Sequence, residues 1–282
     1  MILKNSSLDG RPGPKALLFD LDGTLYRGDE PIPGAGRLVD GTRRRGMLSL
    51  FVTNNSTRTP GEVAEHLSRM GIAAAEEEIV TSAMAAARYV QKNYPGAVTY
   101  AIGEKGLKEA LEQAGMRLTE GEPAVRAELV VQGLDRKLTY AGLAEGATHL
   151  LNGASFVQTN PDRLLPVNGA FLPGAGSVGA ALQAATGIDP IVIGKPSRIL
   201  MDVALGKAGS EPGRSWVVGD NPYTDLAAAQ AAGCPSILVL TGLCTPDDWQ
   251  EHCAKAGVVP DAVCSGPEQL EELLAEWLGE SA

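Results

Sequence analysis

The sequence predicts an α/β fold built on a doubly wound parallel sheet, and two observations lead to this prediction. Short apolar runs alternate along the chain with segments of helical pattern. This alternation is typical of right-handed βαβ units whose sheet is covered on both faces. Several of the runs also end at a turn that carries an acid, a threonine or a lysine. In such a sheet, ligands bind outside the carboxyl ends of the strands, where these turns would meet.

The first part of the chain alternates strands with helices. The strands are expected at Ala16–Phe19, Met47–Val52 and Glu78–Thr81, and the helices at Gly34–Arg45, Pro60–Met70 and Ser82–Asn93. Thr59-Pro60 has the form of an N-cap followed by proline at the first helical position. Gly71 is a typical helix stop.

The same alternation returns near the end of the chain. Strands are expected at Ile191–Ile193, Ser215–Val218 and Ser236–Leu240, and helices at Pro196–Ala208, Asp225–Ala232 and Glu268–Leu278. The middle of the chain has expected strands at Val98–Ile102, Leu129–Val131 and Phe156–Thr159, with helices at Glu104–Ala114 and Thr139–Leu151. None of these middle strands ends in a similar turn. We therefore predict a discontinuous core domain, residues 1–84 and 181–282, interrupted by an inserted α/β domain at residues 85–180.

The composition excludes several classes of protein. The 282 residues include 24 basic and 34 acidic side chains, which gives a formal net charge of −10. Broad binding to nucleic acid or to an anionic membrane needs a basic field, so neither partner is expected. The uncharged stretch Leu164–Ile188 contains five glycines and two prolines, so it would make a poor membrane helix. Four cysteines without a CxxC pair favour reduced thiols in the cytoplasm over a zinc ribbon or a disulfide framework.

The first turn that indicates chemistry is Asp20-Leu21-Asp22-Gly23-Thr24, directly after an expected strand. Two carboxylates this close favour a hard cation with oxygen ligands, and Mg²⁺ is the expected one. A carboxylate can also attack phosphorus and form an aspartyl-phosphate. This turn therefore predicts a metal-assisted site for phosphate chemistry.

Three further turns supply complementary groups. Thr53 offers a hydroxyl and Asn54 a backbone N–H, and both suit phosphate oxygens. Lys195 offers a point charge for phosphate. Asp220 offers a third oxygen for a metal ion, and Asp225 stands at the start of the next helix, where it could orient that ion's ligands. Each turn is common by itself, but their occurrence together and in this order is far more specific.

The charges of these groups make a cation necessary. Asp20, Asp22, Asp220 and Asp225 together carry −4 when ionised, and such a site repels a phosphate dianion. Mg²⁺ and Lys195 restore three positive charges, and a proton on Asp22 brings the sum to zero. This neutralisation is the usual requirement of phosphoryl transfer.

These motifs resemble those of the haloacid dehalogenase superfamily of phosphatases. Residues 20–26 (Asp-Leu-Asp-Gly-Thr-Leu-Tyr) match its first motif, Thr53 its second, Lys195 its third and residues 219–225 (Gly-Asp-Asn-Pro-Tyr-Thr-Asp) its fourth. Phe-Val-Thr-Asn-Asn-Ser (51–56) and Thr-Asn-Pro-Asp (159–162) resemble subclass IIA, the branch that contains 4-nitrophenylphosphatases and the phosphatase of the N-acetylglucosamine operon. The resemblance implies a Rossmann-like core with a large α/β cap of the C2 type between the second and third motifs.

The resemblance also implies a role for each matching residue. Asp20 is the expected nucleophile, and Asp22 is the expected acid that protonates the leaving oxygen and then the base that activates water. The expected Mg²⁺ ligands are the carboxylates of Asp20 and Asp220 and the backbone carbonyl of Asp22. The residues expected to hold the phosphoryl group are Thr53, Asn54, Asn55 and Lys195. Asp225 is expected to support the site.

The expected activity is the Mg²⁺-dependent hydrolysis of a small phosphomonoester, such as a sugar phosphate, a nucleotide, phosphoglycolate or 4-nitrophenyl phosphate. By the same resemblance, the cap supplies specificity and can join two copies in a homodimer. The segment Thr159–Pro173, which contains Asn160, Asp162, Arg163 and Asn168, is where we expect to find the specificity residues. Two alternatives stay open. One is a phosphotransferase or phosphomutase of the same superfamily, and the other is a phospho-receiver or binding protein without turnover.

Two other patterns receive a purely structural interpretation. The glycine-rich run Gly174–Gly179 lacks the preceding strand and the following acid of a dinucleotide site, so we expect it to cross back into the core. The histidines His66, His149 and His252 are scattered without metal-ligand spacing. We expect them to pack in the interior or to lie on the surface.

Overall fold

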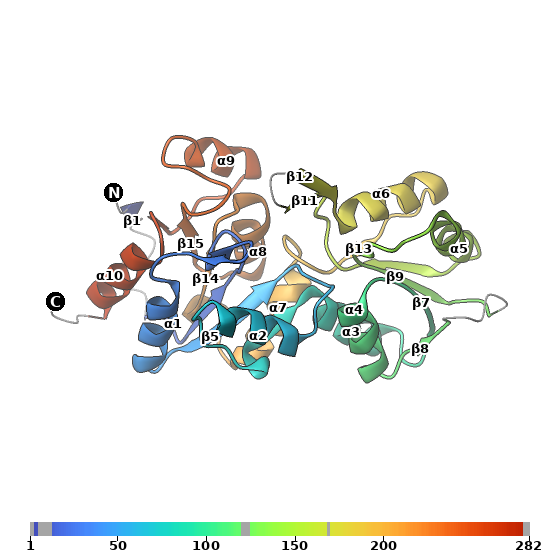
Figure 1. The fold of residues 1–282 in the computed structure, drawn as a ribbon, viewed down its shortest axis with the longest axis horizontal. Coiled ribbons are helices and arrows are strands. Elements are labelled where there is room, and N and C mark those ends of the chain that lie inside the picture. Colours follow the sequence, from blue (N-terminus) through green and yellow to red (C-terminus); the bar gives the residue numbers. More distant parts are fainter. Residues whose placement is uncertain (1–2, 5–12, 120–124, 168–169, 279–282) are drawn as a thin grey trace. The chain divides into compact units, whose positions relative to one another are not determined.

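A computed structural model describes residues 3–4, 13–119, 125–167 and 170–278 (Figure 1). The chain forms two compact units. The first unit comprises Met1–Thr53, Val63–Val80 and Lys195–Ala282, and the second comprises Asn54–Glu62 and Thr81–Gly194. The second unit therefore extends to Gly194, beyond the boundary predicted at residue 180. Asn168, one of the predicted specificity residues, lies outside the described residues.

The first unit is built on a seven-stranded sheet with the strand order β1-β16-β15-β14-β2-β5-β6. Its strands are β1 (Leu3–Lys4), β2 (Ala16–Phe19), β5 (Leu48–Thr53), β6 (Ile79–Thr81), β14 (Ser215–Gly219), β15 (Ser236–Val239) and β16 (Ala262–Cys264). The central pairs β2–β5, β2–β14, β14–β15 and β15–β16 are parallel, and β1 joins β16 antiparallel. A two-stranded hairpin, β3 (Tyr26–Arg27) and β4 (Glu30–Pro31), follows β2. The parallel sheet confirms the predicted fold class.

Helices bury the apolar strands of this sheet. They are α1 (Ala35–Arg44), α2 (Pro60–Arg69), α7 (Arg198–Ala208), α8 (Ala227–Ala232), α9 (Trp249–Ala256) and α10 (Pro267–Trp277). In α10, Leu270, Leu273 and Leu274 recur at helical spacing and are buried, so the acidic residues of this helix are left on its outer face. In Figure 1, α10 lies beside α1, and the two helices are in contact.

The second unit has its own sheet, with the strand order β13-β10-β9-β7-β8. Its strands are β7 (Val98–Ile102), β8 (Arg117–Leu118), β9 (Leu129–Gln132), β10 (Ser155–Gln158) and β13 (Ile191–Val192), all paired in parallel. The helices are α3 (Ser82–Asn93), α4 (Lys105–Gln113), α5 (Tyr140–Leu151) and α6 (Ala175–Thr186). A separate core of Ile102, Val130, Leu150, Ala154, Phe156 and Leu182 forms between them. The second α/β unit is thus present as a sheet with its own hydrophobic core.

Two predictions at the end of the second unit were wrong. The strand expected in the core sheet at Ile191–Ile193 pairs instead with β10, with Ile191 opposite Val157. The glycine-rich run Gly174–Gly179 does not cross back into the core, because it begins α6, whose Leu182 is fully buried in the second unit. A short apolar strand can pair with either of two parallel sheets, and its own residues do not specify which.

The uncharged segment Leu164–Ile188 divides into three elements. The strands β11 (Leu164–Val167) and β12 (Ala170–Pro173) form an antiparallel pair, and α6 follows them. Across the described residues, no helix combines the length and apolar character needed to cross a bilayer.

Candidate active site

Three neighbouring strands of the first unit end at the residues that the sequence singled out. In the parallel sheet, Phe19 of β2 lies opposite Val218 of β14 on one side and Phe51 of β5 on the other. Asp20, Thr53 and Asp220 therefore all follow at the same edge of the sheet. The backbone N–H of Asp20 donates to the carbonyl of Val218 at 2.8 Å, which continues the ladder one residue beyond the strand.

Lys195 joins the acids at this edge. Its Nζ donates to Asp20 Oδ1 at 2.5 Å, to Asp225 Oδ1 at 2.6 Å and to the carbonyl of Val52 at 3.1 Å. Lys195 is 3% exposed and Asp225 is 1% exposed, so this ion pair is almost completely removed from water. The carbonyl of Val52 precedes Thr53, and Lys195 thus connects the first, second and fourth predicted motifs.

Backbone N–H groups hold the two acids of the fourth motif in place. The N–H of Asn221 donates to Asp225 Oδ2 at 3.1 Å, and the N–H of Leu243 donates to Asp220 Oδ2 at 2.7 Å. Asp225 lies in a π-helical turn, Pro222–Leu226, which precedes α8; the sequence predicted an ordinary helix start here. The Asn221 side chain accepts a hydrogen bond from the N–H of Tyr223 and caps the turn.

Glycines at two turns make room for the Asp220 carboxylate. Gly23 has a φ of +86°, a conformation that favours glycine, and a Cβ there would lie 2.6 Å from Asp220 Oδ2. A Cβ at Gly242 would overlap the same carboxylate. The backbones of the turns after β2 and β15 thus come close to Asp220. A side chain at Gly23 or Gly242 would prevent this approach.

Burial and mutual repulsion perturb the ionisation of these groups. Burial raises the pKa of Asp20 well above its ordinary value; Lys195 opposes this rise, and the charges of Asp225 and Asp220 add to it. Burial, together with the charge of Asp225, raises the pKa of Asp220 to about 7. Burial alone would lower the pKa of Lys195, but the carboxylates of Asp20 and Asp225 outweigh it and raise that pKa. Lys195 therefore stays charged, while Asp20 and Asp220 resist ionisation.

This arrangement fits a divalent cation. Asp20, Asp220 and Asp225 each place a carboxylate oxygen within 4.8 Å of the other two. When all three are ionised, Lys195 leaves two negative charges in excess, and this repulsion adds to the burial that raises the pKa values of Asp20 and Asp220. Lys195 and Leu243 occupy Asp20 Oδ1 and Asp220 Oδ2, so Asp20 Oδ2 and Asp220 Oδ1 are the oxygens best placed for an ion. Such oxygen donors suit a hard cation.

Asp22 stands apart from the three-acid group. It is exposed, and its Oδ1 accepts a long hydrogen bond, 3.4 Å, from the N–H of Gly28. Partial desolvation raises the pKa of Asp22, and the hydrogen bonds from Gly28 and Gly23 lower it less. Its carboxylate is therefore open to a reacting group and inclined to hold a proton.

Thr53 and the two asparagines after it differ in their surroundings. Thr53 is buried at the end of β5 in the first unit. Asn54 and Asn55 belong to the second unit. The Asn54 amide contacts the Asp162 carboxylate at 3.1 Å, and Asn55 Oδ1 accepts from the N–H groups of Thr57 and Arg58. Both side chains therefore organise the second unit locally, a role that the sequence did not predict.

The carbonyl of Asn54 has two donors from elsewhere in the second unit. It accepts from Ser82 Oγ at 2.6 Å and from Asn160 Nδ2 at 2.8 Å. The motif Thr-Asn-Pro-Asp at 159–162 is thus tied to the asparagine pair through Asn160 and Asp162. Sequence reasoning placed Asn160 and Asp162 among specificity residues but did not predict this connection.

Sequence reasoning also missed backbone groups that complete the site. The carbonyl of Val52 and the N–H of Leu243 contact Lys195 and Asp220, respectively. No side-chain pattern identifies a backbone contact. The one signal at Leu243 is the preceding Thr241-Gly242 at the end of a strand, because Gly242 permits the close approach to Asp220.

Comparisons with known proteins identify the family of this chain. Residues 17–117 match the family described as haloacid dehalogenase-like hydrolase, and residues 192–265 match a HAD-hydrolase-like family. The chain is 42% identical to an acid sugar phosphatase from Staphylococcus epidermidis, over 84% of this chain and 90% of that protein. It is 38% identical to the 5'-nucleotidase YutF from Bacillus subtilis, over 94% of this chain and 97% of that protein.

The solved structures include a p-nitrophenyl phosphatase from Archaeoglobus fulgidus. That structure superposes with a TM-score of 0.87 at 33% sequence identity, over 93% of this chain and all of the other. Its likeness extends over both units. The chain therefore belongs to the haloacid dehalogenase-like hydrolases and is a phosphatase of that family.

Proposed function

We propose that the protein hydrolyses small phosphomonoesters with the help of Mg²⁺, through an aspartyl-phosphate on Asp20. The observation that carries this proposal is the buried group at the carboxyl edge of the sheet. There, the Asp20 carboxylate contacts Lys195 at 2.5 Å beside Asp220 and Asp225. This group combines a nucleophile, a fixed cation and oxygen donors for a metal ion.

The proposed first step transfers the phosphoryl group to the enzyme. An oxygen of Asp20 attacks phosphorus while the bond to the leaving oxygen breaks, and Asp22 gives its proton to that oxygen. The raised pKa of Asp22 supports this role, because a general acid must hold a proton near neutral pH. Lys195 neutralises charge on the phosphoryl oxygens as the transfer proceeds.

The proposed second step releases phosphate. Asp22, now a carboxylate, takes a proton from a water molecule, whose oxygen attacks phosphorus. The bond between phosphorus and Asp20 breaks, which restores the Asp20 carboxylate and yields inorganic phosphate. The covalent route replaces one difficult displacement with two easier ones.

The proposed side-chain ligands of Mg²⁺ are Asp20 Oδ2 and Asp220 Oδ1. The backbone carbonyl of Asp22 is the third proposed ligand. The bound ion would supply positive charge that offsets the acids and polarises the phosphoryl oxygens. Asp225 holds Lys195 in place, since it is the more deeply buried of the two carboxylates that contact Nζ.

The names of the relatives support a small substrate. Sugar phosphates, nucleotides and 4-nitrophenyl phosphate are the phosphomonoesters that we propose to test first. Asn160, Asp162 and Arg163 are the proposed specificity residues. The homodimer through the second unit and the cytoplasmic location also stay predictions.

A phosphoenzyme experiment tests the mechanism. Wild-type protein with Mg²⁺ should release phosphate steadily from 4-nitrophenyl phosphate, and acid quenching should trap a phosphorylated peptide that contains Asp20. Asp20→Asn should lower turnover on the order of 10⁴-fold and abolish the trapped peptide. Asp29→Asn is the matched control, because its side chain is 94% exposed and should keep the full rate. A phosphopeptide that persists in Asp20→Asn, or activity unaffected by EDTA, would refute the proposal.

A further inference from the structure

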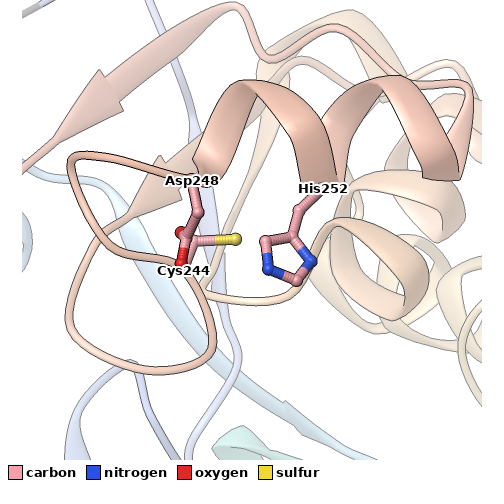
Figure 2. A group of neighbouring side chains, drawn as sticks. All are labelled: Cys244, Asp248 and His252. Carbon is pink, nitrogen blue, oxygen red and sulfur yellow. The ribbon is translucent and has the colours of Figure 1, made fainter.

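A second group of metal-binding side chains lies in the first unit, apart from the three acids of the active site. It consists of Cys244, Asp248 and His252, whose donor atoms all lie within 4.8 Å of one another (Figure 2). Asp248 is the N-cap of α9, and His252 stands one helical turn further on, so both side chains share a face of the helix. Cys244 belongs to the loop that leads into α9. The spacing of these three residues matches no common zinc motif, so the sequence did not predict a metal role for His252.

Each of the three side chains offers a donor atom toward the others. Figure 2 shows the Cys244 thiol pointing toward the imidazole of His252. Asp248 Oδ1 accepts from the N–H of Thr245 at 2.7 Å, and the Thr245 hydroxyl also bonds to this carboxylate. An ion would bind the carboxylate oxygen that lies within 4.8 Å of the Cys244 and His252 donors. His252 Nδ1 lies 3.2 Å from the Tyr223 hydroxyl, so Nε2 is the nitrogen that can bind an ion while that contact is kept.

The Tyr223 contact gives His252 the support that metal-bound histidines usually have. In metal sites the second ring nitrogen is generally hydrogen-bonded, which fixes the tautomer and the ring orientation. Here the ring of Tyr223 also packs edge-on against the imidazole, with centroids 5.8 Å apart and an interplanar angle of 86°. The hydroxyl and the ring of Tyr223 therefore both hold the imidazole in place.

We propose that Cys244, Asp248 and His252 form a second metal site, for Zn²⁺ or a similar divalent transition-metal ion. A sulfur, a nitrogen and a carboxylate oxygen are the donors that zinc takes in proteins, whereas Mg²⁺ prefers oxygen alone. Zinc bond lengths of about 2.3 Å to sulfur and 2.0 Å to nitrogen place tetrahedral ligands about 3.5 Å apart. The three donors, which now lie within 4.8 Å of one another, would have to move closer together, and a water molecule would take the fourth position.

The burial of Cys244 bears on how the ion would bind. Cys244 is 1% exposed, so its sulfur faces the interior of the group and not the solvent. Asp248 and His252 are half-buried, so an ion can reach the group from their side.

The proposed site adjoins the active site through two residues, Leu243 and Tyr223. Leu243, next to Cys244, donates its N–H to Asp220, and Tyr223 lies in the same π-helical turn as Asp225. Activity alone would consequently be an ambiguous measurement, because either metal site could change it. A spectroscopic signal from the Cys244 sulfur separates the two sites.

Cobalt titration of the full chain provides that signal. Metal-free protein is first given excess Mg²⁺ and is then titrated with Co²⁺. We expect a thiolate-to-cobalt charge-transfer band in the near ultraviolet, with visible bands of tetrahedral cobalt that saturate at one equivalent and disappear when Zn²⁺ is added. Cys244→Ser should abolish the charge-transfer band, and Asp248→Asn and His252→Gln should each weaken Co²⁺ binding at least tenfold.

Cys234→Ser is the matched control, because Cys234 is also buried but lies outside the group. This variant should keep the charge-transfer band and the affinity. The proposal is overturned if wild-type protein gives no such band, or if the band survives in Cys244→Ser. Should Cys244→Ser fail to fold, His252→Gln decides: unchanged cobalt affinity in that folded variant would equally refute the site.

Discussion

Asp220 provides a prediction about stability that can be worked out from its surroundings: Asp220→Asn should stabilise the metal-free protein at alkaline pH. Asp220 is buried, and its pKa is raised from 3.8 to about 7. Between these two values the folded protein holds a proton on Asp220 that the unfolded chain has released. Stability therefore falls as the pH rises through this interval, and the penalty is complete above about pH 7.

The raised pKa sets the size of the effect. A difference of about 3 in pKa corresponds to about 4 kcal/mol. Asparagine removes the titrating group and still offers an oxygen to the N–H of Leu243. Removing the charge of Asp220 also lowers the pKa of Asp20, which acts in the same direction. We expect the free energy of unfolding of metal-free Asp220→Asn to exceed that of wild type by about 2 kcal/mol at pH 5 and by about 4 kcal/mol at pH 8.

Urea unfolding in EDTA, followed by tryptophan fluorescence, measures this difference. Trp216 is buried in the first unit, with its ring centroid 4.3 Å from that of Trp277, so its emission should report unfolding of that unit. Glu65→Gln makes the same charge change at an exposed position of α2, and its difference in stability from wild type should not depend on pH. Added Mg²⁺ should reduce the difference in stability, because the proposed site holds the ion through the Asp220 carboxylate, which Asp220→Asn lacks. The reasoning would be refuted if Asp220→Asn and wild type had the same free energy of unfolding in EDTA, or if the difference between them became smaller as the pH rises.

Three further predictions follow from contacts in each unit. Lys195→Met leaves buried carboxylates without their cation, so it should lower the free energy of unfolding by about 3–5 kcal/mol, as measured by chemical unfolding. The same variant should lower kcat/KM on the order of 10²-fold or more, as measured by steady-state kinetics. Gly242→Ala should crowd Asp220 and weaken Mg²⁺ on the order of tenfold or more, as measured by calorimetry, whereas Gly206→Ala, where a Cβ meets nothing within 4 Å, should leave Mg²⁺ binding intact. Leu182→Ala should lower the free energy of unfolding by about 2–5 kcal/mol, because Leu182 is fully buried in the core of the second unit. An unchanged midpoint of thermal unfolding would contradict this prediction.

The sequence indicated the strands of the first unit because their residues carry a strong local signal. Ala16–Phe19 and Ser215–Gly219 are continuous apolar runs, each followed by an acid, and both lie where they were predicted. A strand buried on both faces must be apolar along its whole length, so it is recognisable without its neighbours. The turns that follow β2 and β14 could then be placed at one edge of the sheet by topology alone.

Elements that depend on a distant partner could not be predicted in this way. β13 has two residues and is assigned to the second unit only by its pairing with β10. The hairpin of β11 and β12 was missed in the uncharged segment, and the group at Cys244, Asp248 and His252 was missed because no known spacing marks it. In each case the deciding contact comes from outside the local pattern.

The amino-acid sequence by itself determined the fold class, the family and the identity of Asp20, Asp22, Thr53, Lys195, Asp220 and Asp225 as candidate residues, because these depend on residue type, order and local periodicity. Only the tertiary structure decided how the charges are arranged. It showed that Lys195 contacts both Asp20 and Asp225, that backbone groups of Val52 and Leu243 complete the site, and that the side chains of Asn54 and Asn55 are engaged within the second unit. The reason is physical: the pKa values and ion affinities depend on distances and burial, which exist only once the strands have been brought together.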